Sequence, residues 1–204
     1  RGGFHQGGIV GRAYSPAGTI TISDCYSIGR QSKNDGTDGG VGWDDAPNRI
    51  NGATHIGGIV GIFDSPQGSV TNCYAAGTIS NFGGTNTIGA HYSGGIASRV
   101  TSGSVSGCVA LQTSIASVLE ASTHRVRGYV TAAAPLTNNY ANAEMAITLA
   151  GVSAEIIGVG ADSDGGADVT LTDAKTQTFY TGLGWDFNST WTIKAGAYPT
   201  LKWE

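Results

Sequence analysis

Three cysteines stand at the same place in successive repeats of this sequence. Cys25, Cys73 and Cys108 each precede an aromatic or apolar residue. A free thiol packs as a small hydrophobe, so we predict a buried, reduced column of cysteines. Stacked strands lie about 4.8 Å apart, which permits a disulfide by distance, but parallel Cβ vectors disfavour one. No base is fixed beside any of the thiols, which argues against a catalytic cysteine.

The four histidines also recur with the repeats, at positions 5, 55, 91 and 124. A column of imidazoles could bind a transition metal. The alternative is a column of turn residues, in which each ring bonds a backbone group or water. We favour the second interpretation, because the distance from each histidine to the next repeated residue changes by one along the chain.

An acidic, glycine-rich insert at residues 32–50 contains the candidate ligand-binding residues Trp43, Asp44 and Asp45. An indole can stack on a sugar ring while carboxylates bond its hydroxyl groups. An insert without fixed structure is the competing interpretation, since ordering so many glycines costs entropy.

A second acidic loop carries Asp162, Asp164 and Asp168. Hard oxygen ligands on a flexible loop suit Ca²⁺, so these residues are candidates for a calcium site. Their spacing does not match an EF-hand, and aspartate and glycine are also ordinary turn residues. No cofactor is expected.

Aromatic residues gather near the end of the sequence, at Trp185, Phe187, Trp191, Tyr198 and Trp203. An open end of a repeat array exposes core and strand edges and must be covered. We therefore predict that this tail is a cap. A ligand-binding platform is the alternative.

The composition restricts the class of protein. The chain has 204 residues, 33 of them glycine, with 13% charged residues, 40% hydrophobic residues and a net charge of −4. We expect no nucleic-acid partner, because phosphate binding needs clustered lysine and arginine. No apolar stretch approaches the roughly 20 residues of a membrane helix. The chain opens inside a repeat, which indicates an excerpt or a mature fragment of a longer protein.

The repeats themselves are clear. Gly7–Gly11 reads GGIVG and recurs at residues 57–61, with drift at 94–98 and in worn form at 127–130. One predicted core column therefore consists of Ile9, Ile59, Ile96 and Tyr129, and a second of Ile20, Val70 and Val105. No unit shows a helical period, and none can bury its own apolar face, so the units must stack.

We therefore predict an all-β fold, a right-handed parallel β-helix or β-solenoid of stacked glycine-rich repeats with an aromatic C-terminal cap. Residues 1–160 would form the solenoid, and residues 161–204 would be a capping segment of the same domain. Glycines at the strand ends would provide the positive-φ corners that a solenoid needs.

The two GGIVG copies and the block from Gly68-Ser69-Val70 to Cys73-Tyr74 resemble the GLUG repeat of bacterial surface proteins. The resemblance implies an extracellular, adhesin-like protein that is secreted or anchored at the outer membrane. Such a protein would bind a ligand on a host cell or a neighbouring cell, and this ligand could be a glycan. No motif of a hydrolase, a nucleotide-binding enzyme or a zinc protease is present, so we expect no catalysis. A carbohydrate-binding or polysaccharide-degrading β-helix is the alternative, since stacking can join distant carboxylates. A third possible function is that of a plain spacer.

Overall fold

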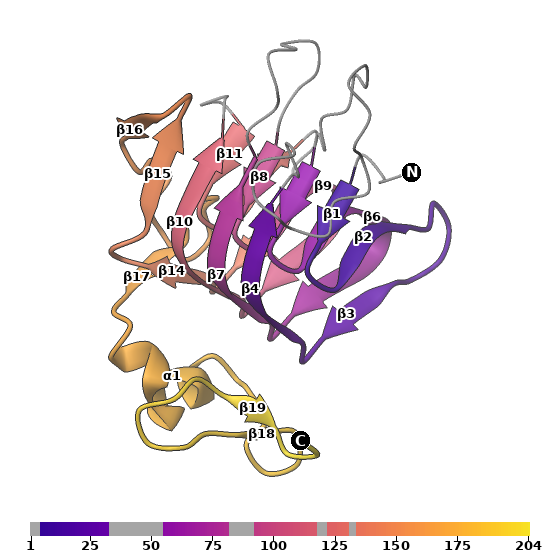
Figure 1. The fold of residues 1–204 in the computed structure, drawn as a ribbon. Coiled ribbons are helices and arrows are strands. Elements are labelled where there is room, and N and C mark those ends of the chain that lie inside the picture. Colours follow the sequence, from indigo (N-terminus) through magenta and orange to yellow (C-terminus); the bar gives the residue numbers. More distant parts are fainter. Residues whose placement is uncertain (1–4, 33–54, 82–91, 118–121, 131–133) are drawn as a thin grey trace.

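The computed structural model describes residues 5–32, 55–81, 92–117, 122–130 and 134–204. Four coils of short strands stack on one another and build three parallel sheets (Figure 1). This arrangement is the predicted β-solenoid, and its right hand stays a prediction. Coils 1 to 4 denote residues 5–32, 55–80, 92–117 and 123–149.

The first two sheets each take strands from all four coils, in parallel register. The first sheet consists of β1 (His5–Gly7), β5 (His55–Gly57), β8 (Tyr92–Gly94) and β11 (Thr123–His124). The second consists of β2 (Val10–Tyr14), β3 (Thr21–Ser23), β6 (Val60–Thr71), β9 (Ala97–Ser106), β12 (Arg127–Val130) and β13 (Leu136–Thr137).

The third sheet holds the strands that follow the cysteines. It consists of β4 (Tyr26–Ser32), β7 (Tyr74–Ser80), β10 (Val109–Ser117), β14 (Tyr140–Asn142), β15 (Ala146–Leu149), β16 (Val152–Ala154) and β17 (Ala167–Val169). All its pairs are parallel except β15 with β16, which form an antiparallel hairpin. Alternating side chains of this sheet face the core inside the coils and the outer surface.

The first core column is confirmed for three of its four members. The amide of Ile9 donates to the carbonyl of Ile59 at 3.0 Å, and the amide of Ile59 donates to that of Ile96 at 2.9 Å. The fourth member is Val126, whose carbonyl accepts from Ile96 at 2.9 Å. The prediction of Tyr129 in this place was wrong, because Tyr129 pairs with Arg99, outside the column.

The second column also differs in its first coil. Val70 and Val105 are paired as predicted, but Ile22 and not Ile20 pairs with Val70, and Leu136 continues the column in coil 4. Coil 1 has two more residues after its corner glycine than coil 2 has. The apolar residue that stacks is the one three positions before the cysteine, not the one after the glycine.

The corner before each cysteine position has a left-handed backbone. Asp24, Asn72, Gly107 and Asn138 have φ values of 51°, 52°, 60° and 57°. Asparagine and aspartate tolerate this conformation better than other residues with a side chain. The prediction of glycine corners therefore holds here for one coil of four.

The second glycine of the GG pairs in coils 2 and 3 allows neighbouring coils to approach closely. A Cβ atom on Gly58 would lie 1.9 Å from the carbonyl oxygen of Gly95, and one on Gly95 would lie 2.1 Å from that of Arg125. In coil 4 an arginine, Arg125, takes this position, because no further coil of the same kind follows it.

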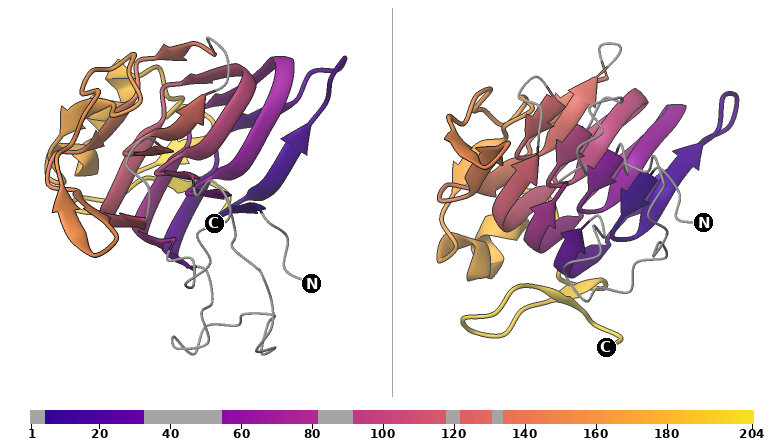
Figure 2. Two further views of the ribbon diagram at one scale, coloured as in Figure 1. Left: turned by 90° about the horizontal axis from the view of Figure 1, so that it is seen from above. Right: turned by 45° about the horizontal axis from the view of Figure 1, so that its top comes forward.

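The end of the stack at coil 4 is covered by residues 157–169. The amides of Val126 and Arg127 donate to the carbonyl of Asp164, and β17 pairs with β14. The hairpin of β15 and β16 extends the same end (Figures 1 and 2).

The aromatic tail lies elsewhere than predicted. Residues 170–204 contain a 3-10 turn (Asp173–Lys175), the helix α1 (Gln177–Gly182) and a small hairpin of β18 (Trp191–Thr192) and β19 (Thr200–Leu201). They pack against the outer surface of β4, β7, β10 and β14, at the side of the solenoid and not over its end (Figure 1). The outward column of Tyr26, Tyr74, Val109 and Tyr140 is aromatic or apolar, and it needs this cover.

Candidate binding groove

The sequence-predicted ligand residues Trp43, Asp44 and Asp45 lie outside the described residues. Their role in binding therefore stays a prediction. Coils 1 and 2 flank this segment, since β4 ends at Ser32 and β5 begins at His55.

The three candidate calcium ligands have partners within the protein. Asp164 pairs with the guanidinium of Arg127 at 2.6 Å, and Asp168 with that of Arg125 at 2.7 Å. An oxygen of Asp162 accepts from a backbone amide at 2.9 Å. These contacts hold the end-covering segment on coil 4. Within the described part of the chain, no three side chains of His, Cys, Asp or Glu converge as a metal site would require.

The histidine column extends over two coils. His5 and His55 are paired in register, with their Nδ1 atoms 3.3 Å apart. The next residue in the column is Tyr92, and His124 pairs with Gly94 instead. Position 91 lies outside the described residues. His124 lies two residues before the core residue Val126, whereas His5 and His55 lie four residues before Ile9 and Ile59, so His124 does not continue the column.

The cysteine column is confirmed in register, and its fourth member is Asn139. All three thiols are free, and each donates to the carbonyl two residues before it, at 3.0 to 3.4 Å. Cys73 and Cys108 are fully buried, whereas Cys25 in coil 1 is half-buried. The hydrogen bond with Cys73, then burial, raises the pKa of Cys25, so this thiol is not activated.

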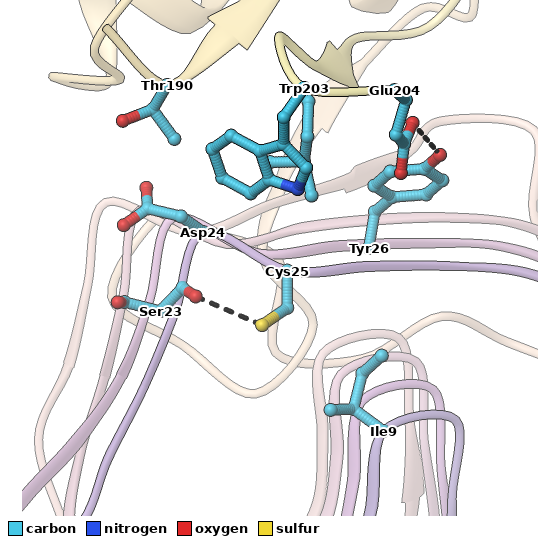
Figure 3. Close-up of a pocket in the computed structure, with 9 residues that line it drawn as sticks. Ile9, Ser23, Asp24, Cys25, Tyr26, Thr190, Trp203 and Glu204 are labelled. Carbon is cyan, nitrogen blue, oxygen red and sulfur yellow. Dashed lines mark hydrogen bonds between the residues drawn. The ribbon is translucent and has the colours of Figure 1, made fainter.

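An open groove of about 650 Å³ lies between coil 1 and the end of the tail (Figure 3). Its apolar surface comes from Ile9, Cys25, Leu201 and Trp203. The indole of Trp203 lies across the middle of the groove and is 70% exposed (Figure 3).

Polar groups stand on both sides of this indole. Asp24 and Thr190 lie on one side, and Tyr26 and Glu204 on the other (Figure 3). The hydroxyl of Tyr26 donates to Glu204 at 2.5 Å, and this bond, followed by desolvation, raises the pKa of Tyr26. Asp24 is held by the indole nitrogen of Trp191, which donates to it at 3.2 Å.

The groove brings together Tyr26 and Glu204, which are 178 positions apart in the sequence. Sequence reasoning named Trp203 only as part of the tail, and it did not select Asp24, Tyr26 or Glu204. Asp24 occupies a left-handed corner position. The available signal that an aromatic tail would pack there was the pair Tyr26 and Tyr74, which follow the first two cysteines. Their ring centroids lie 5.1 Å apart in a stack.

Comparison with known families gives one match. Residues 52–80 match the family model described as the GLUG motif. This chain carries a GLUG motif. The GLUG segment covers coil 2, from just before β5 to the end of β7. The strands of the neighbouring coils follow in the same order and pair in register with those of coil 2. No curated protein and no solved structure matches the chain.

Proposed function

We propose that this chain is an extracellular, adhesin-like binding module at the surface of a cell, and that it works without catalysis. The observation that carries the proposal is the exposed Trp203 in an open groove on a rigid stack of coils. An exposed indole leaves a large apolar area in water, and aromatic residues in such places are common anchors of binding sites.

The scaffold supports the same interpretation. Binding residues tend to lie on segments held by a rigid framework. Here one wall of the groove belongs to coil 1, which is hydrogen-bonded to coil 2 throughout β4 and β7. The resemblance of coil 2 to the GLUG motif agrees with a surface-exposed repeat protein. No helix among the described residues is long and apolar enough to cross a membrane.

A second candidate function is cleavage of a polysaccharide. It is favoured by the two carboxylates that flank the groove, Asp24 and Glu204, since glycosidases act through pairs of carboxyl groups. The cysteine in the groove does not add a nucleophile, because its pKa is raised.

The test is an array of glycans and extracellular-matrix proteins, probed with wild type, Trp203→Ala and Trp43→Ala. We expect a specific signal for wild type that Trp203→Ala weakens. A loss with Trp43→Ala alone would move the site to the insert. A chain that binds no component would contradict the proposal, and release of reducing or unsaturated sugar from polysaccharides would replace it with the enzymatic alternative.

A further inference from the structure

The groove also indicates the chemical class of its ligand. Two of the other tryptophans, Trp185 and Trp191, are 3% and 0% exposed and belong to the core under the tail. Trp203 is 70% exposed. Its ring therefore offers a flat apolar surface that the fold itself does not use.

A second apolar surface lies at the bottom of the same groove. Ile9 is 45% exposed, whereas Ile59 and Ile96, its equivalents in the next two coils, are fully buried. Ile9 therefore adds a second apolar side chain to the groove, on the far side of Cys25 from the indole (Figure 3). A ligand that fits must have an apolar face of its own.

The polar groups of the groove are acceptors and hydroxyls. Asp24 and Glu204 contribute carboxylates, and Ser23, Tyr26 and Thr190 contribute hydroxyl groups. Of the described residues that line the groove, none is basic. Carboxylates form strong hydrogen bonds with hydroxyl donors and repel anions.

The acceptors are also held in place before any ligand binds. Asp24 accepts from the indole of Trp191, and Glu204 accepts from Tyr26. Groups that are already ordered lose less entropy when a ligand binds.

A pyranose ring combines an apolar C–H face with hydroxyl donors around its rim. We propose that this groove binds a neutral hexopyranose unit of a glycan, with one face of the sugar on Trp203 and its hydroxyl groups on Asp24 and Glu204. This inference rests on the proposed binding function and deepens it. Sugars with a carboxylate, such as uronic acids, are excluded by the two carboxylates.

The experiment is isothermal titration of the intact chain with hexasaccharides of glucose, mannose and galactose, and with hexagalacturonate as the anionic counterpart. We expect saturable binding of at least one neutral hexasaccharide and none of hexagalacturonate. Trp203→Ala should weaken the neutral interaction about tenfold or more. Tyr14→Ala is the matched control, because Tyr14 is another exposed aromatic, 54% exposed, on β2 and not among the residues that line the groove.

Asp24→Asn tests the charge without disturbing the corner. Asparagine occurs at the equivalent corners Asn72 and Asn138 with the same left-handed backbone. The amide oxygen can still accept from Trp191. We expect this variant to bind neutral sugar several-fold more weakly and to lose part of its discrimination against hexagalacturonate.

Several results would overturn the inference. These are equal affinity of wild type and Trp203→Ala, equal losses in Trp203→Ala and Tyr14→Ala, tighter binding of hexagalacturonate, or no binding of any neutral hexasaccharide. In the last case, a matrix protein bound on the array would leave the adhesin-like function standing. If the chain bound no component of the array, both the sugar-binding inference and the adhesin-like function would be contradicted.

Discussion

Replacement of Gly58 by alanine tests the closeness of the coils. The added Cβ atom would lie 1.9 Å from the carbonyl oxygen of Gly95, 2.6 Å from the Cβ of Ala75 and 2.6 Å from the side-chain nitrogen of Gln112. A backbone carbonyl cannot rotate away as the end of a flexible side chain can. Coils 2 and 3 must therefore separate locally.

The cost follows from this separation. An ordinary contact would require the two coils to move apart by about 1.5 Å at this point. The hydrogen bonds from Gly58 to Gly94 at 3.2 Å and from Ile59 to Ile96 at 2.9 Å cross the same gap. Overpacking costs about 1–3 kcal/mol, and each buried hydrogen bond lost adds about 1 kcal/mol. We expect the free energy of unfolding to fall by about 3–5 kcal/mol.

Guanidinium denaturation followed by circular dichroism measures this change. Gly182→Ala is the matched control, because Gly182 ends α1 and an added Cβ meets nothing within 4 Å. It should leave stability unchanged or raise it slightly, since alanine favours a helix. If Gly58→Ala lowered the free energy of unfolding by less than about 1 kcal/mol, the coils would not approach as described.

Three further experiments address the covered end and the thiols. Arg125→Met should lower the free energy of unfolding by about 3 kcal/mol or more in the same denaturation assay. The reason is that the buried guanidinium donates to three backbone carbonyls besides its contact with Asp168. An unchanged denaturation midpoint would contradict the role of Arg125 in holding the covering segment on coil 4. Native protein should show no rapid reaction of Cys73 or Cys108 with a thiol reagent and three thiols after unfolding, and two missing thiols would reveal a disulfide. Since the folded state raises the pKa of Cys25 and Cys73 above the usual value of 9.0, their contribution to stability is complete below pH 9 and declines as the pH rises further. A melting temperature that stayed constant above pH 9 would refute this.

The repeat pattern predicts most of the solenoid, because residues that stack must be alike. The GG pairs, the cysteines and two of the core columns are recognisable for this reason, and the structure confirms their pairing. The errors occur where a terminal coil is released from that requirement. Coil 4 has Arg125 in place of a glycine. The partial repeat at Gly128-Tyr129 therefore led us to align Tyr129 with the core column, three residues after the true member, Val126.

The error in coil 1 has a different source. Alignment on the corner glycine selected Ile20, whereas alignment on the cysteine would have selected Ile22. The corner before the cysteine has a fixed left-handed conformation in every coil, and the glycine turn varies in length. The rigid corner is therefore the better reference for register.

The groove could not be predicted from the repeats, because half of it belongs to the tail. Composition shows that the tail is aromatic, but it does not show whether the tail covers an end or a side. The side is chosen because the outward residues Tyr74, Val109 and Leu111 are apolar and need cover, while residues 157–169 already cover coil 4.

The lateral tail changes how the stack should come apart. A solenoid in which each coil touches only its neighbours behaves as a one-dimensional chain and can lose terminal coils one at a time. Here the tail bonds to Asp24 in coil 1, Tyr74 in coil 2 and Gly107 in coil 3, and Phe179 packs on Tyr140 in coil 4. Loss of any one coil disturbs a segment that the other three share, so the tail couples distant coils and makes the whole array unfold as one cooperative unit.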